Sequence, residues 1–158
     1  MFIGRERELQ ELNRLFESDR FEFAVIYGRR RVGKTALITQ FIRDKDAIYF
    51  MGVESSSKQN LENLSKSIIE YSSGIEADTS FLSFQAALEY VFKLAETKRL
   101  ILVIDEYPYV ARASKSLAST LQMLIDRYRD SSKLMLILCG SSMSYMDCLL
   151  YTSPSPRD

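Results

Sequence analysis

The chain has 158 residues, of which 46% are hydrophobic and 27% charged, and its formal net charge is zero. These values are ordinary for one globular domain and exclude a general electrostatic attraction to nucleic acid or anionic membranes, although a local basic patch stays open. No apolar run approaches the roughly 18 residues of a membrane helix, and no secretory leader is visible, so we expect a cytoplasmic protein without membrane contact. Two cysteines, Cys139 and Cys148, and no histidine argue against a disulfide framework and a zinc site.

The first element expected is an amphipathic helix within residues 1–16. Three leucines and a phenylalanine over residues 9–16 fall on one helical stripe, with charged residues between them. Residues 21–27 are rich in β-forming side chains and end at a glycine, which predicts a strand. Apolar residues at helical spacing over residues 35–43 then predict a helix.

Between this strand and this helix, residues 28–35 read GRRRVGKT and match the P-loop pattern G-x-x-x-x-G-K-[ST] at every position. Gly28 and Gly33 allow a tight turn and a close approach of the backbone to phosphate oxygens, which a Cβ would obstruct. The N–H groups of the loop and helix start form an anion cradle, Lys34 can reach the β- and γ-phosphates, and the Thr35 hydroxyl can ligate Mg²⁺. The residues expected to bind the nucleotide are Gly28, Arg29, Arg31, Val32, Gly33, Lys34, Thr35 and Ala36.

The arginines of the loop allow several interpretations. Positions 29–31 are the variable positions of the motif, where side chains usually point away from the phosphates. They could contact DNA, an acidic partner or the nucleotide of a neighbouring subunit, or they could be solvated surface charge. No arginine finger can be assigned from the sequence.

The remaining elements alternate between strands and helices. Further strands are expected over residues 47–51, 100–104 and 134–139, and further helices around residues 61–72, 84–95 and 117–128. The last two strands are continuously apolar, as in a parallel sheet covered on both faces. The chain is therefore expected to form one domain, a three-layer α/β/α sandwich with a parallel sheet, over residues 1–147.

Asp105 and Glu106 follow directly after one of these apolar strands, as in a Walker B motif. A carboxylate at the C-terminal end of such a strand points into the crevice where open α/β sheets bind ligands. We expect Asp105 to hold Mg²⁺, directly or through water, and Glu106 to act as general base on the attacking water. The alternatives are a solvated acidic pair, or a pair that binds Mg²⁺ without supporting hydrolysis.

Gly140-Ser141-Ser142 ends the last predicted strand. A hydroxyl there could contact the γ-phosphate or the lytic water, and Ser141 is slightly preferred over Ser142 for this sensor role. The alternative is that both serines begin a turn or cap a helix.

Residues 148–158, CLLYTSPSPRD, resemble translated read-through of a sequencing-library adapter. We interpret this stretch as a non-native, disordered tail and expect the native protein to continue beyond residue 147 with different residues. A genuine disordered Ser/Pro tail is the alternative.

With these motifs, residues 1–147 resemble the archaeal-type ATPases of the AAA+/STAND group of P-loop proteins. The resemblance rests on FIGREREL at 2–9, YGRRRVGKT at 27–35, IDEYPY at 104–109 and LCGSS at 138–142. It implies ATP as the nucleotide, sheet order 5-1-4-3-2, and packing of residues 2–5 near the adenine. Family members usually continue into a helical lid, a winged helix and sometimes a nuclease-like domain; here the fifth strand and everything after it are expected to be missing.

The predicted function is hydrolysis of Mg·ATP by a P-loop core that drives or switches an effector, DNA or protein, reached through the missing C-terminal part; oligomerisation is possible. The alternative is a nucleotide-gated binding module with little or no hydrolysis. The guanine motif N-K-x-D and the transporter signature L-S-G-G-Q are absent from the sequence, whereas a small-molecule kinase and a P-loop fold with an inactive site stay open. Loss of the fifth strand is also expected to leave strand 21–27 as an unpaired apolar edge that promotes self-association.

Overall fold

A computed structural model describes residues 3–27, 33–73 and 80–140. These residues form a four-stranded, fully parallel sheet in the order β1-β4-β3-β2. The strands are β1 (Glu22–Tyr27), β2 (Ala47–Met51), β3 (Leu100–Asp105) and β4 (Leu134–Gly140). This order confirms the 1-4-3-2 part of the predicted sheet. The predictions of a missing fifth strand and of a disordered tail concern the chain after residue 140, outside the part that the structure describes.

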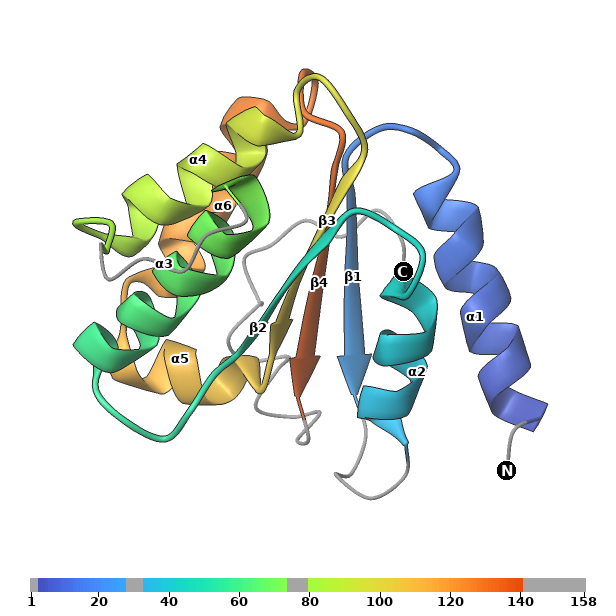
Figure 1. The fold of residues 1–158 in the computed structure, drawn as a ribbon, viewed down its shortest axis with the longest axis horizontal. Helices are drawn as coiled ribbons and strands as arrows, with labels where there is room; N and C mark the ends of the chain where they lie inside the picture. The colour runs from blue at the N-terminus through green and yellow to red at the C-terminus, as the bar shows by residue number, and fades with distance from the viewer. Residues whose placement is uncertain (1–2, 28–32, 74–79, 141–158) are drawn as a thin grey trace.

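Helices cover both faces of the sheet and give the three predicted layers (Figure 1). One face carries α1 (Ile3–Phe16) and α2 (Lys34–Ile42), and the other carries the remaining four helices. These are α3 (Ser57–Ser73), α4 (Phe84–Leu94), α5 (Tyr107–Ala113) and α6 (Leu117–Tyr128). In the described ranges no helix is long and apolar enough to cross a membrane.

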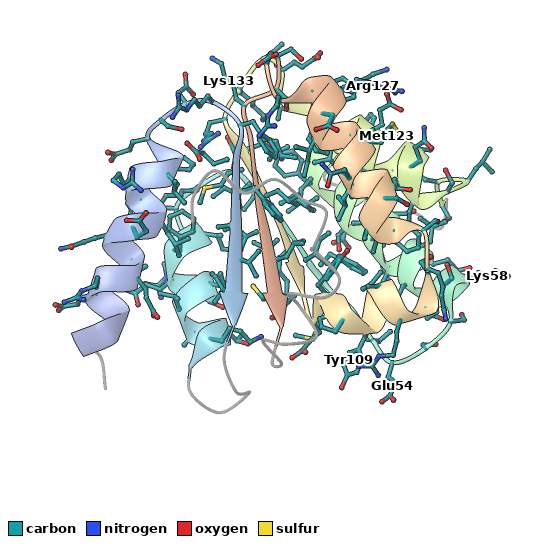
Figure 2. All side chains as sticks on the ribbon, turned by 180° about the vertical axis from the view of Figure 1, so that it is seen from behind. Glu54, Lys58, Tyr109, Met123, Arg127 and Lys133 are labelled. Carbon is teal, nitrogen blue, oxygen red and sulfur yellow. The ribbon has the colours of Figure 1, made fainter. Side chains whose placement is uncertain are left out.

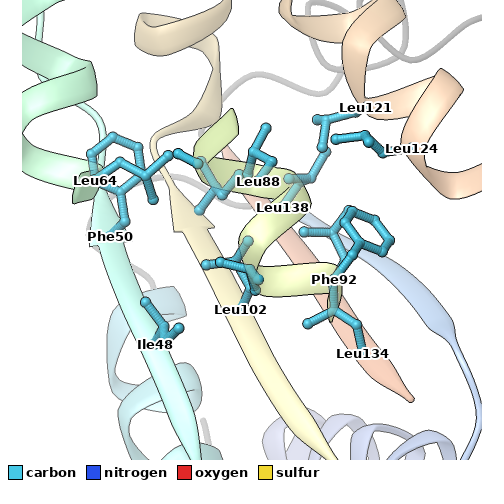
Figure 3. Close-up of a cluster of buried hydrophobic side chains, with 14 of the residues drawn as sticks. Ile48, Phe50, Leu64, Leu88, Phe92, Leu102, Leu121, Leu124, Leu134 and Leu138 are labelled. Atoms are coloured by element: carbon cyan, nitrogen blue, oxygen red, sulfur yellow. The ribbon is translucent and has the colours of Figure 1, made fainter. Parts of the chain in front are cut away.

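The sheet separates two hydrophobic clusters, which explains why its central strands are apolar at every position. Along β3 the side chains of Leu100, Leu102 and Ile104 pack toward the four-helix face, whereas Ile101 and Val103 pack toward α1 and α2. Every residue of β3 and β4 is buried. Figure 3 shows the larger cluster, in which leucines of β3 and β4 meet phenylalanine and leucine side chains of α4 and α6. A strand covered on both faces needs apolar residues at odd and even positions alike.

Helix α5 is an element that the sequence pattern did not predict. It begins immediately after Glu106, which has left-handed backbone angles (φ 52°, ψ 44°), and its second residue is Pro108. A proline in the first helical turn costs no hydrogen bond, because the N–H groups there have no partner inside the helix. A helix of seven residues is also too short for a 3.6-residue period to stand out.

At the opposite end of the sheet, where the strands begin, Arg99 joins three parts of the chain. Its guanidinium donates to the carbonyl oxygens of Leu15 (2.7 Å), Phe16 (2.9 Å), Arg20 (2.5 Å) and Lys133 (2.6 Å). Figure 2 labels Lys133 at this end. The side chain therefore connects the end of α1, the turn before β1 and the start of β4.

Candidate nucleotide-binding site

The candidate site lies at the carboxyl edge of the sheet, where the strands end and α2 begins (Figure 1). Gly33, the last glycine of the P-loop motif, caps α2 with φ 86° and ψ 19°. This left-handed conformation is accessible to glycine without strain and explains why the motif needs glycine here. The first N–H groups of α2 lack partners inside the helix, and together with the helix dipole they favour an anion at this position.

Lys34, the first residue of α2, points into the sheet rather than into solvent. Its ammonium donates to Oδ1 of Asp105 at 2.8 Å and lies 3.8 Å from Oε2 of Glu106. The side chains of Lys34 and Asp105 are 2% and 1% exposed, and that of Glu106 is 12% exposed. The structure thus brings the P-loop lysine and both predicted acidic residues into one nearly buried ionic cluster.

In the turn after β3, the side chain of Asp105 is held by a backbone hydrogen bond, and the backbone of Glu106 is strained. Asp105 is the last residue of the strand, and its Oδ1 also accepts the backbone N–H of Glu106 at 2.9 Å. Glu106 stands in the left-handed region, which costs a non-glycine residue on the order of 1 kcal/mol. This left-handed conformation turns the chain sharply from the end of β3 into α5.

Thr35 and Ala36 are both exposed in the first turn of α2. The Thr35 hydroxyl and the Asp105 carboxylate are hard oxygen donors at one edge of the sheet, and Mg²⁺ typically takes one or two protein oxygens and keeps several waters. The residues present therefore fit magnesium. A cage of three or more His, Cys, Asp or Glu side chains does not occur among the described residues.

Two further residues belong to this site, although the sequence motifs did not indicate them: Tyr49 of β2, and Gly52 directly after that strand. The hydroxyl of Tyr49 donates to Oδ2 of Asp105 at 2.5 Å. Burial, and then the hydrogen bond to Asp105, raise the pKa of Tyr49 well above its usual value, so the hydroxyl remains a donor at neutral pH. The backbone N–H of Gly52 donates to the carbonyl of Asp105 at 2.8 Å, and a Cβ on Gly52 would lie 2.7 Å from the carbonyl oxygen of Glu106.

Cys139 of β4 is fully buried in the hydrophobic cluster between the sheet and helices α1 and α2. Burial, with a smaller contribution from the charge of Asp105, raises the pKa of the thiol to about 12. The thiol is therefore protonated at neutral pH and unreactive, because the thiolate is the nucleophilic form.

Several predicted site residues lie outside the part of the chain that the structure describes. These are Gly28, Arg29, Arg31 and Val32 of the loop, and Ser141 after β4. The predicted contact of residues 2–5 with the adenine also stays a prediction, because Phe2 and the side chains of residues 3–5 lie outside the described part of the chain.

The fold is a three-layer α/β/α sandwich with a parallel sheet. In its site, the glycine and lysine of a P-loop meet an acidic pair at the end of a strand. Together these features define a P-loop ATPase. The family model for an ATPase domain predominantly from Archaea matches residues 2–157, and the chain belongs to this family. An uncharacterised protein of Methanocaldococcus jannaschii is 35% identical over 156 residues, which cover 98% of this chain and 33% of that protein. A second protein of the same organism, described as an uncharacterised ATP-binding protein, is 44% identical over 45 residues, covering 28% of this chain and 76% of that protein.

Solved structures share the fold at low sequence identity. The Walker-type ATPase of Pyrococcus abyssi superposes with a TM-score of 0.69 at 21% identity, covering 95% of this chain and 48% of that one. The Orc1 protein of Aeropyrum pernix in complex with DNA gives a TM-score of 0.68 at 16% identity, covering 96% of this chain and 43% of that one. The chain thus spans a third of the longer curated relative and less than half of these two structures.

Proposed function

We propose that this chain is the core of an ATPase that hydrolyses Mg·ATP in order to drive or switch an effector carried elsewhere in the protein. The observation that carries the proposal is the cluster of Lys34, Asp105 and Glu106 beside the N-terminus of α2. One cation and two carboxylates at the carboxyl edge of a parallel sheet are the groups that phosphate transfer to water requires.

In this proposal each residue has one task. Backbone N–H groups of the loop and of residues 33–36 hold the phosphates, Lys34 contacts the β- and γ-phosphates, and Thr35 and Asp105 hold Mg²⁺. Bound magnesium would neutralise charge that develops on the phosphate oxygens. Glu106 accepts a proton from the attacking water, and Ser141 contacts the γ-phosphate or that water.

The ion pair between Lys34 and Asp105 supports a role for this cluster in binding. A phosphate that takes up the ammonium competes directly with Oδ1 of Asp105, which lies 2.8 Å from it. Binding of the nucleotide therefore changes the charge balance around both acidic residues. Such a change links occupancy of the site to the turn that leads into α5.

The experiment that tests hydrolysis is Glu106→Gln, which keeps the size of the side chain and removes its basicity. We expect ATP binding to be retained and phosphate release to fall by at least about 100-fold, since general bases typically contribute 10²–10⁴ in rate. Glu54→Gln is the control, because Glu54 is an exposed carboxylate at the same edge of the sheet (Figure 2). Undiminished turnover in the Glu106 variant would contradict the assignment, and nucleotide binding without turnover in the unmodified chain would favour the nucleotide-gated module.

The effector is proposed to be DNA or a protein, reached through sequence beyond this chain. Support comes from the solved structures of Aeropyrum pernix Orc1 in complex with DNA and of Drosophila ORC bound to DNA, which share the fold. We further propose that the protein is a STAND-type, Mg²⁺-dependent ATPase of the cytoplasm that can oligomerise. Steady-state phosphate release from the unmodified chain, measured with and without duplex DNA, tests the DNA branch of this proposal.

A further inference from the structure

Tyr49 is the feature of the site that the P-loop and acidic motifs do not account for. It lies on β2, which pairs with β3 in a register that places Tyr49 beside Val103 and Met51 beside Asp105. Tyr49 packs against the α1–α2 side of the sheet, and from there its hydroxyl reaches Asp105 at the end of the neighbouring strand. A strand outside both sequence motifs thus contributes a direct contact to the candidate magnesium ligand.

The two oxygens of Asp105 have different partners. Oδ1 accepts the ammonium of Lys34 at 2.8 Å and the backbone N–H of Glu106 at 2.9 Å, whereas Oδ2 accepts the hydroxyl of Tyr49 at 2.5 Å. A carboxylate held through both oxygens cannot rotate about its Cβ–Cγ bond without losing a charge-assisted hydrogen bond. The phenol therefore fixes the plane of the carboxylate, so that one oxygen faces Lys34 while the other faces Tyr49.

We propose that Tyr49 is a positioning residue that holds Oδ2 of Asp105 and so keeps Oδ1 directed at Lys34 and available to the magnesium shell. This inference rests on the proposed function, since it assigns Tyr49 a part in Mg·ATP binding. Tyr49 acts through Asp105 and contacts neither phosphate nor water in the reaction. Its contribution should therefore be seen in the magnesium-dependent part of nucleotide binding.

The first test compares ATP binding with Mg²⁺ and with EDTA in Tyr49→Phe, which keeps the ring and removes the hydroxyl. We expect the affinity for ATP in Mg²⁺ to fall about tenfold, the effect of one lost hydrogen bond to a charged group. The affinity in EDTA should not fall, because without magnesium Asp105 contributes no ligand and only competes with phosphate for the ammonium of Lys34. No loss in Mg²⁺, or an equal loss under both conditions, would overturn the inference.

Tyr128→Phe is a matched control. The hydroxyl of Tyr128 also donates to a carboxylate, that of Glu89, at 2.5 Å. This contact joins α6 to α4 on the four-helix face of the sheet, away from Lys34. We expect Tyr128→Phe to leave both ATP affinities unchanged, and a tenfold loss in this variant too would overturn the inference.

A second test needs no nucleotide and separates this inference from the proposed function. The melting temperatures of Tyr49→Phe, Asp105→Ala and the double variant form a double-mutant cycle, because alanine leaves no acceptor for the phenol. If the hydroxyl holds Asp105, the double variant should melt about 3 °C above the value expected from adding the two single effects. Additive effects would overturn the inference. Failure of the unmodified chain to bind ATP would instead overturn the proposed function, and the cycle would still decide the role of Tyr49.

Discussion

Lys34 is the residue on which the balance of charge in the site depends. Its ammonium lies within 4 Å of the carboxylates of Asp105 and Glu106, and its side chain is almost completely buried. Removing one member of a buried ion pair leaves an uncompensated charge in a low-dielectric surrounding, which costs more than the pair itself contributes. The lysine of the P-loop motif therefore has a structural task in addition to its proposed contact with phosphate.

We predict that Lys34→Met lowers the free energy of unfolding by about 3 kcal/mol, because two carboxylates are then left close together without a cation. Urea unfolding in the absence of nucleotide measures the change. Lys133→Met is the control: Lys133 pairs with Asp19 at 3.3 Å, but its side chain is 40% exposed, and the loss should stay below about 1 kcal/mol. Equal losses in the two variants would contradict a special role for the buried cluster.

Glu106 offers a second prediction at this scale, because its left-handed backbone is strained for any residue with a Cβ. Glu106→Gly and Glu106→Ala both remove the carboxylate, so comparing them isolates the backbone. We expect the glycine variant to melt about 3 °C higher than the alanine variant, in reverse of the usual order, since relief of the strain is on the order of 1 kcal/mol. An alanine variant of higher melting temperature would show that the turn is unstrained.

At the scale of elements, most of the fold could be predicted from periodicity. β2 occupies the predicted residues 47–51, a short apolar run that ends at a glycine, and α6 the predicted residues 117–128, where apolar residues recur at helical spacing. Helix α5 could not be predicted, since it is short and starts from a strained residue without a side-chain cap. A side-chain cap and a clear period are the stronger signals of a helix, and α5 has neither; Pro108 in its first turn was the remaining signal.

The meeting of Lys34 with Asp105 could also be predicted, because a P-loop helix and a strand-end acid share the carboxyl edge of a parallel sheet. The contact of Tyr49 with Asp105 could not. It depends on β2 pairing directly with β3 and on a register that places their ends together. The available signal was the hydroxyl of Tyr49 in an otherwise apolar strand. Without the register of β2 on β3, the sequence does not show which residue that hydroxyl contacts.

Arg99 leads to a prediction about how the elements are held together. Its planar guanidinium reaches four carbonyl oxygens at once, an arrangement that a lysine ammonium cannot reproduce. We expect Arg99→Lys to lower the free energy of unfolding by about 2 kcal/mol, because carbonyls at the start of the sheet lose their donors. Arg14→Lys is the control, since Arg14 is 61% exposed and pairs with Glu11 one helical turn away. Comparable losses of unfolding free energy in the two variants would show that Arg99 makes no special contribution to the stability of this end of the sheet.

At the scale of the whole molecule, the side of β1 that pairs with no other described strand is the surface where we expect association between chains. Among the described strands β1 has one neighbour, β4, and beside it lies a groove of about 300 Å³. The groove is lined by apolar residues of α1, α2 and β1 together with two glutamates: Leu12, Leu15, Leu37, Ala24, Val25, Ile26, Glu8 and Glu11. A strand with one unpaired side beside an apolar groove can pair with a strand of another chain.

We therefore predict that this chain self-associates at tens of micromolar, and that Val25→Lys weakens the association at least about tenfold by placing a charge at a half-buried position of the edge strand. Analytical ultracentrifugation over a range of concentrations measures both. Met51→Lys is the control, because Met51 is 44% exposed on β2, the other outer strand, and the variant should associate like the unmodified chain. A monodisperse monomer at these concentrations would contradict the prediction.

The strand order also has a consequence for how the chain folds during its synthesis. Glu22 of β1 pairs with Met135 of β4, so β1 leaves the ribosome about 110 residues before its neighbour in the sheet exists. At translation rates of roughly 5–20 residues per second, this apolar strand waits about 6–20 s without a partner. During that interval β2 and β3 can already pair, because their residues are all synthesised before β4. The nascent chain thus exposes β1 for longer than any other strand described here, and a chaperone that binds extended apolar segments would meet this strand first.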